Sequence, residues 1–521
     1  MKIQLTAAAI LALASSAFAL DGQIGIHDPG TVTLCDGKFY TWGTGGTPLV
    51  SDDGWTWRGG VRASRSGAAP DTIRVGDRYY MYISGVTMIY NKTLDPNSPD
   101  FKWEDGGNIA GYDGPGDFVN PIDPAALLGP DGRMWLTYGS YVGFLRLVEL
   151  DPKTGKRLHP EQAPYNIAVN CEASCMIYHD GWYYLTATHG SCCRGADSGY
   201  NIRVGRAKQP TGPFLDNMGV DMIQGGGWQL CGSGGRVIGP GHFGLIDLGD
   251  GVQRFSLHWE ADLDHGGGSV LDILPLVWKD GWPEAGENFK PGTYQIASVR
   301  TGTALELAVE EVAVGGGRGG RGGGGGGARG GAGRGAPGAA PDTNAAPARG
   351  GDAAAPADAA ARGARGPGGG GGMGGGMFGG GRGGIVPDQD VNQVMTNWPT
   401  GNIDTRLANY MCQAQQKWTV TAVTNAGGWL GSPFFKITIA GTDRALAVSP
   451  EMELVTLPAF TGAPEQLWCI EQLPDATWRL TPKSLRGTKQ ALTMSAVGRG
   501  FASLAKYNAD SDRQRWLFKA P

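Results

Sequence analysis

Apolar and polar residues alternate in short runs through the first half of the chain, and a polar turn precedes each run. The turn contains Gly and usually Asp, and the residues that follow it are rich in aromatic side chains. A period of two residues is that of a half-buried strand, so each unit predicts a β-hairpin. Five copies are present, at 36–40, 76–80, 131–135, 180–184 and 250–255.

The spacing of these hairpins, roughly 40 to 70 residues, matches the length of one sheet blade in a ring of blades. The sequence therefore predicts an all-β fold that begins with a five-bladed β-propeller. A β-sandwich is the alternative arrangement of the same strands.

An acidic or histidine side chain recurs before these hairpins, about eight residues ahead of the turn. The hairpin structure alone does not explain why it is there. Equivalent positions in successive blades lie at similar radius and height, so these side chains are expected to converge near one end of the axis. They are Asp28, Asp123, Glu172 and His242, with Asp71 at a slightly shorter offset in the second copy.

Several acids in one cleft repel one another, which raises at least one pKa and lets one carboxyl stay protonated while another is ionised. Glycoside hydrolysis requires that division between a general acid and a carboxylate that activates water or attacks the sugar. The structural alternative is that Asp28 and Asp123, each followed by Pro, form turns and cap local backbone.

A second period occupies the C-terminal third. The triplet Gln-x-Trp begins at Gln416, Gln466 and Gln514, about 50 residues apart. Aromatic-led strands precede each triplet, within 294–307, 435–448 and 478–494. Three such copies predict a pseudo-threefold β domain. Because the first copy is far longer than the others, we interpret the Gly-rich tract within it as an insertion.

That tract, about 314–386, consists largely of Gly, Ala, Arg and Pro. It carries too few apolar side chains to offset its ordering entropy, so disorder is predicted. Its Arg residues leave an RNA-binding tract as an alternative. The whole chain has 44 basic and 49 acidic residues and a net charge of -5, which indicates neither a nucleic-acid nor a membrane-surface protein.

The first 19 residues have the charged, apolar and small-residue order of a secretory signal. The mature protein is therefore expected to begin near Leu20 and to be secreted or periplasmic. No later apolar stretch approaches the roughly 20 residues that span a bilayer. Export permits disulfides among the eight cysteines.

The residues around the aligned acids resemble glycoside hydrolase family 43, and within it the secreted arabinanases that cleave α-1,5-linked arabinan. The resemblance covers roughly residues 25–283 and implies a five-bladed propeller and an inverting mechanism. It rests on the segments at 26–29, 120–124, 135–140, 181–185, 191–195, 200–206 and 238–242.

The resemblance implies roles for the acids: Asp28 as general base, Glu172 as general acid, and Asp123 as the carboxylate that raises the pKa of the acid and orients it. Inversion implies acid and base carboxyls roughly 6.5–9.5 Å apart. His242 matches a histidine near an axial calcium or sodium ion, held largely through water. No organic cofactor is implied.

The resemblance also implies substrate contacts, namely His27, Asp71, Asn120, Ser140, Cys192, Cys193 and Arg203. Cys192 and Cys193 bonded to each other would form an apolar patch beside the sugar. Separate disulfides, or a zinc site with Cys171, Cys175 and His189, are the alternatives.

The expected partner is a plant cell-wall polysaccharide of the arabinan type. Family relatives with the same three acids act on arabinofuranosyl side chains, xylosides or galactan, and a non-catalytic glycan-binding propeller is a further alternative.

The Gln-x-Trp repeats resemble the ricin-type lectin β-trefoil, which implies a propeller over 20–288 and a trefoil over 289–521. Such lectins hold sugar hydroxyls with an aspartate that would fall at Glu306, Ala447 and Thr493 here. Only the first of these is an acid, so glycan binding by the trefoil stays an open expectation.

Overall fold

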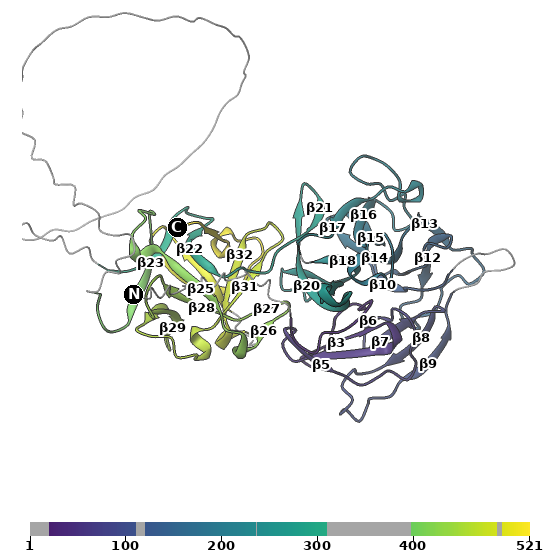
Figure 1. Cartoon of the computed structure of the whole chain (residues 1–521), viewed down its shortest axis with the longest axis horizontal. Coiled ribbons are helices and arrows are strands. Elements are labelled where there is room, and N and C mark those ends of the chain that lie inside the picture. Colours follow the sequence, from purple (N-terminus) through teal and green to yellow (C-terminus); the bar gives the residue numbers. More distant parts are fainter. Residues whose placement is uncertain (1–19, 111–119, 236, 310–397, 487–491) are drawn as a thin grey trace, which may run out of the picture. The chain divides into compact units, whose positions relative to one another are not determined.

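The structure is a computed structural model that describes residues 20–110, 120–235, 237–309, 398–486 and 492–521. The predicted signal segment 1–19 and the predicted disordered insertion 314–386 lie outside the described residues. No helix among the described residues is long and apolar enough to cross a membrane. Figure 1 shows the strands in chain order, from purple through teal to yellow.

Five antiparallel sheets follow one another along residues 21–285. The first contains β2 (Thr33–Cys35), β3 (Lys38–Gly43), β4 (Thr47–Ser51) and β5 (Thr56–Gly59), with β1 (Asp21–Gly22) parallel to β5. The second contains β6 (Asp71–Val75), β7 (Arg78–Ile83), β8 (Thr87–Asn91) and β9 (Glu104–Asn108).

The third sheet contains β10 (Ala125–Leu128), β11 (Met134–Tyr138), β12 (Phe144–Leu150) and β13 (Tyr165–Val169). The fourth contains β14 (Glu172–His179), β15 (Trp182–His189), β16 (Asn201–Ala207) and β17 (Trp228–Cys231). The fifth contains β18 (Ile238–Asp247), β19 (Gln253–Ala261), β20 (Gly268–Lys279) and β21 (Trp282–Ala285). Short 3-10 turns connect strands within these sheets: η1 (Thr44–Gly46), η2 (Gly195–Asp197), η3 (Met222–Gln224) and η4 (Leu263–His265).

These sheets are the five blades of a β-propeller, so the predicted propeller is confirmed and the sandwich alternative is wrong. The first strands of successive blades, from β2 through β6, β10 and β14 to β18, contact one another and form the inner wall. The last blade is joined to the start of the chain, where Ile26 N–H donates to Ser269 O at 3.0 Å.

The Asp-Gly turns account for the hairpins locally. Asp36 and Gly37 have φ of 49° and 80°, and Asp180 and Gly181 have φ of 46° and 77°. Two consecutive positive φ values suit a two-residue turn whose twist matches that of the strands, and Asp-Gly is among the sequences that adopt it most readily. A Cβ built on Gly37 would meet nothing within 4 Å, so glycine is needed there for its backbone angles and not for space.

Large apolar side chains fill the spaces between the blades. Tyr80, Tyr82 and Met88 of blade 2 pack against Met134 and Leu136 of blade 3. A second cluster joins blades 4 and 5 through Ile177, Tyr184, Phe243, Phe255 and Leu257. Burying each such side chain stabilises the fold by about 1.5–3 kcal/mol, so packing between blades holds the ring closed.

The C-terminal strands form a ten-stranded sheet with two small hairpins. Their bounds are β22 (Gly292–Ser298), β23 (Ala304–Leu307), β24 (Ile403–Ala408), β25 (Trp418–Ala422), β26 (Gly428–Trp429), β27 (Ser432–Pro433), β28 (Phe435–Ile439), β29 (Ala445–Val448), β30 (Leu454–Leu457), β31 (Trp468–Gln472), β32 (Trp478–Pro482), β33 (Leu492–Val497), β34 (Phe501–Lys506) and β35 (Trp516–Lys519). The 3-10 turns are η5 (Ala414–Gln416), η6 (Thr424–Ala426), η7 (Pro464–Gln466), η8 (Lys483–Leu485) and η9 (Asp512–Gln514).

The three Gln-x-Trp triplets have the same structure. Each Gln ends a 3-10 turn, is buried, accepts a backbone N–H with its side-chain oxygen at 2.7 Å and donates its side-chain nitrogen to a backbone carbonyl. Each Trp is buried and donates its indole N–H to a backbone oxygen, at Leu305, Leu446 and Met494. The predicted threefold repeat therefore exists in the hydrogen bonding, while the ricin-type trefoil stays a prediction.

Glu306 occupies the position that would carry a sugar-binding acid in the first repeat, and its carboxylate makes hydrogen bonds within the domain. Glu306 is buried, and its two oxygens accept from Arg406 Nε at 2.6 Å and Gln416 Nε2 at 2.7 Å. Ala447 and Thr493 are also buried. The Glu306 carboxylate thus connects two parts of the first repeat.

One disulfide is present, between Cys192 and Cys193. The other six cysteines are free, and Cys412 is exposed. The alternative of separate disulfides for Cys192 and Cys193 is therefore wrong. Among the described residues, Cys171, Cys175 and His189 do not form a cluster with metal-ligand spacing.

We expect Gln466→Ala to destabilise the C-terminal domain. The substitution removes the buried Gln466 amide and its hydrogen bonds to Thr461 N–H and to the carbonyl of Ala459, and each such bond contributes about 0.5–1.5 kcal/mol to the unfolding free energy. Urea unfolding followed by tryptophan fluorescence measures the effect. Glu465→Ala, in the same turn, is the matched control and should change little; equal stability of both variants would contradict the role given to Gln466.

We expect the cysteines to differ in reactivity. Cys412 should be alkylated first in the native protein, because it is exposed and its neighbours Tyr410 and Lys417 lower the pKa of its thiol. In denaturant without reductant, six cysteines should react, and Cys192 and Cys193 only after reduction. Peptide mass spectrometry measures this, and alkylation of Cys193 without reductant would disprove the pairing.

Candidate active site

The aligned side chains of the five blades lie close enough to determine one another's charge. His242 Nδ1 lies 3.7 Å from Asp28 Oδ1. The proton affinity of Asp123 depends on the charges of His242, Asp28 and Glu172, and that of Asp71 depends on His242. The structure therefore brings these five side chains together, while their place at one end of the axis stays a prediction.

An unusual backbone conformation accompanies this convergence. Asp28, Asp123 and His242 have φ of 52°, 53° and 61°, while Ala173, next to Glu172, and Ala69, near Asp71, have 49° and 43°. Left-handed φ at a residue other than glycine costs of order 1–3 kcal/mol and persists where the surrounding structure imposes it. Every blade thus bends its chain in the same way where it reaches the inner wall.

Asp28 lies just before β2 and is held by four neighbours. Thr44 Oγ1 donates to Oδ2 at 2.7 Å, and Asp28 N–H donates to His258 Nδ1 at 3.1 Å. His27 Nε2 lies 3.4 Å from Oδ2. Burial raises the pKa of Asp28, but the neighbouring His242 lowers it by more, so the net pKa lies below its usual value. Asp28 is thus an ionised carboxylate.

The pKa values of Asp123 and Glu172 are shifted in the opposite direction, upward. Burial, with the charges of Asp28 and Glu172, outweighs the attraction to His242 and raises the pKa of Asp123 to about 8. One Asp123 oxygen accepts Ala173 N–H at 3.1 Å, directly beside Glu172. Burial also raises the pKa of Glu172, although a hydrogen bond from the Tyr200 hydroxyl counteracts it. The site therefore combines one ionised carboxylate with two that retain protons more strongly.

His242 supplies the positive charge. Burial lowers its pKa, but Asp28, and then Asp123 and Asp71, raise it more, so the net pKa is above the usual value. Its backbone N–H donates to Thr188 Oγ1 at 2.9 Å. Its Nδ1 is buried and makes no hydrogen bond to the described residues.

Asp71 connects neighbouring blades. Oδ1 accepts Thr31 N–H of blade 1 at 2.8 Å, and Oδ2 accepts Ala126 N–H of blade 3 at 3.3 Å. Burial raises the pKa of Asp71 above its usual value despite these two bonds. In the structure as it stands, Asp71 therefore holds the inner wall together beneath the site.

Three of the predicted substrate contacts lie together at the site: His27 is beside Asp28, and the sulfurs of Cys192 and Cys193 are beside His27. His27 Nε2 is 3.9 Å from Cys192 Sγ, and its Nδ1 is 2.9 Å from Ser269 Oγ. The His27 ring lies 4.5 Å from that of His258. The disulfide of Cys192 and Cys193 thus borders the site next to the proposed base.

The remaining predicted contacts are less closely connected. Arg203 in β16 donates Nε to Asn201 Oδ1 at 3.0 Å. Ser140 is buried and accepts Val142 N–H at 3.5 Å, and Asn120 is half-buried. Within the part of the chain described, no hydrogen bond or ion pair joins Asn120, Ser140 or Arg203 to the three acids.

Sequence reasoning missed three residues that contact the acids. His258 in β19 is fully buried with its pKa lowered by burial to about 3, so it is a neutral ring beside Asp28. Tyr200 and Thr44 donate hydroxyls to Glu172 and Asp28. Tyr200 belongs to a segment that carried the family resemblance, and this was the one signal in the sequence that could have identified it. His258 and Thr44 lie outside the aligned repeat position, so the repeat could not identify them.

His27, Asp28 and His258 place one ligand atom each within 4.8 Å of one another. His242, the predicted metal residue, is not in that group. Calcium and sodium prefer oxygen ligands, which fits contact through water to the buried Nδ1 of His242 better than direct ligation. The cluster that includes His27, Cys192 and Cys193 offers no thiolate, because the two sulfurs are bonded to each other.

Comparison with known proteins gives relatives over the same region. The extracellular exo-α-(1→5)-L-arabinofuranosidase of Cellvibrio japonicus is 34% identical over 310 residues, which are 51% of this chain and 87% of that protein. The extracellular endo-α-(1→5)-L-arabinanase 1 of Bacillus subtilis is 31% identical over 226 residues, 41% of this chain and 67% of that protein.

Among solved structures, an exo-1,5-α-L-arabinanase from a bovine ruminal metagenomic library is 30% identical, with a TM-score of 0.48, and covers 52% of this chain and 100% of its own. The family model described as glycosyl hydrolases family 43 matches residues 38–283, which span most of the five blades. The chain therefore belongs to glycosyl hydrolases family 43 and is a glycoside hydrolase.

Proposed function

We propose that this enzyme is a secreted hydrolase of arabinan-type plant polysaccharide that cleaves α-L-arabinofuranosidic linkages with inversion. The observation that carries the proposal is the convergence of the three acids in one buried site, where their surroundings lower the pKa of Asp28 and raise those of Asp123 and Glu172. Relatives named as extracellular arabinan-cleaving enzymes support the substrate and the export.

In the proposed reaction, Glu172 donates its proton to the glycosidic oxygen as the bond to the sugar carbon breaks. Asp28 removes a proton from a water that attacks the same carbon from the opposite face. The products carry the added water, and Glu172 is left ionised and Asp28 protonated. Proton exchange with solvent restores the starting state.

Asp123 does not exchange a proton with substrate in this scheme. Its hydrogen bond to Ala173 N–H fixes the backbone next to Glu172, so it positions the acid. Its negative charge, when present, raises the pKa of Glu172. Tyr200 holds the Glu172 carboxyl from the other direction.

His27 and the bonded pair Cys192 and Cys193 are proposed to contact the sugar beside Asp28, with Asp71, Asn120, Ser140 and Arg203 in support. A calcium or sodium ion near His242 is proposed to lie on the axis, held through water, where it would add positive charge beside the acids. Arabinofuranosyl branches, xylosides and galactan remain alternative substrates, and product analysis on linear arabinan distinguishes internal from terminal cleavage.

For the C-terminal region we propose a ricin-type β-trefoil over 289–521 that follows a propeller over 20–288. The threefold set of buried Gln and Trp hydrogen bonds supports it. The alternative of a propeller that binds glycan without turnover is disfavoured by the differing proton affinities of the acids, and a reducing-sugar assay on plant polysaccharides separates the two.

We expect Glu172→Gln to abolish arabinan hydrolysis, because the amide cannot protonate the leaving oxygen. General acid catalysis is worth about 10²–10⁴-fold in rate, and release of reducing ends measures the loss. Glu161→Gln, an exposed glutamate of the same domain, is the matched control and should retain full activity. Undiminished activity of Glu172→Gln would remove Glu172 from the mechanism.

We expect Tyr200→Phe to move the alkaline limb of the pH–rate profile to higher pH. The acid must be protonated, so activity falls as the pH rises through the pKa of Glu172. The Tyr200 hydroxyl stabilises the ionised carboxylate and lowers that pKa, and its removal raises it. kcat/KM measured across pH tests this, with Tyr178→Phe as control; a limb that moves to lower pH would contradict the assignment.

A further inference from the structure

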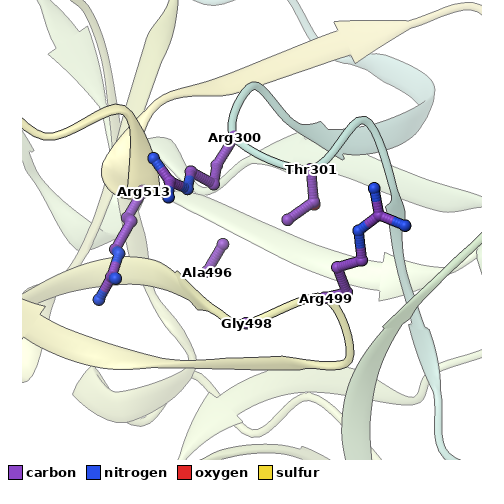
Figure 2. A pocket seen from close by; sticks show the side chains of 6 residues that line it. All are labelled: Arg300, Thr301, Ala496, Gly498, Arg499 and Arg513. Atoms are coloured by element: carbon purple, nitrogen blue, oxygen red, sulfur yellow. The ribbon is translucent and has the colours of Figure 1, made fainter. Parts of the chain in front are cut away.

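The C-terminal domain contains a cavity of about 350 Å³ lined by three arginines. Arg300 and Thr301 come from the connection between β22 and β23, Arg499 from the turn between β33 and β34, and Arg513 from η9. Figure 2 shows Arg300 and Arg513 on one side and Arg499 on the other, with Thr301, Ala496 and Gly498 between them. The first and third repeats together therefore build this cavity.

The cavity carries an excess of positive charge. Arg300 Nη1 lies 3.2 Å from each carboxylate oxygen of Asp512, which neutralises one guanidinium. Arg499 and Arg513 make no ion pair with any other residue in the described ranges. Figure 2 shows the guanidinium groups of Arg499 and Arg513 at opposite ends of the cavity. Each is thus available to a separate carboxylate of an anionic ligand, which the excess of positive charge attracts.

The residues that line the cavity suit a small planar anion, such as a carboxylate, that is attached to a single ring. A guanidinium presents a fork of donors that matches a carboxylate with two parallel hydrogen bonds. Thr301 adds a hydroxyl, while Ala496 and Gly498 leave space beside the charged groups. The volume lies at the lower end of the roughly 300–1,000 Å³ of small-molecule sites, which suits a sugar ring or two.

We propose that this cavity binds the carboxylate of a uronic acid residue in an acidic polysaccharide. A uronic acid is a sugar that carries a planar carboxylate. A glycoside hydrolase encounters such carboxylates as part of acidic polysaccharides. None of the lectin-type positions Glu306, Ala447 and Thr493 lines this cavity.

Isothermal titration of the full chain with oligogalacturonides of about ten residues tests this proposal, with neutral arabino-oligosaccharides and inorganic sulfate as comparison probes. We expect binding of the uronate that weakens with salt and that falls at least about tenfold in the double variant Arg499→Gln/Arg513→Gln. Lys519→Gln removes one exposed positive charge of the same domain and should change the affinity less than twofold.

Three outcomes would overturn the proposal. They are uronate binding that the double variant retains, no uronate binding at all, and sulfate binding as tight as that of the oligogalacturonide, which would indicate a general small-anion site. Thr301→Asp, which places an acid in the cavity, is a second variant and should also abolish binding. Hydrolysis of neutral arabinan by the double variant should stay unchanged, so failure here is distinct from failure of the proposed function.

Discussion

The site depends on a shortage of positive charge around buried carboxyl groups. His242 is the cation among the acids, and it lies next to Asp28. The low dielectric of the buried site makes every further ionisation costly, so Asp28 holds the negative charge while Asp123 and Glu172 hold protons more tightly. An enzyme that needs a base and an acid at the same pH obtains both from this one constraint, although both groups are carboxylic acids with similar pKa values in water.

The propeller fold holds these carboxyl groups close together. Asp28, Asp123 and His242 each adopt a left-handed backbone conformation, which an isolated chain would avoid. The apolar clusters between blades, such as that of Phe255 and Phe243, supply the stability that offsets the strain. Asp71 adds two hydrogen bonds across the inner wall, so the blades cannot separate without exposing a buried acid.

The repeat in the sequence was sufficient to predict the propeller and the five convergent positions, because blade length and blade position are both periodic. It could not predict His258, which faces Asp28 from the second strand of blade 5, since no other blade has a counterpart there. Thr44 is equally isolated. The bond between Cys192 and Cys193 was one of several open pairings, because sequence spacing does not specify which sulfurs meet. Contacts unique to one blade require the structure.

The C-terminal domain shows that repeats can keep the same structural hydrogen bonds while charged residues take on different roles in different repeats. The Gln and Trp of each triplet keep the same hydrogen bonds in all three copies, and these bonds need nothing from a ligand. Glu306 gives its oxygens to Arg406 and Gln416 and so belongs to that framework. The turns between strands are free of such demands, and Arg499 stands on one of them. A surface that evolves ligand contacts on the turns can acquire a new specificity without disturbing the core that closes the domain.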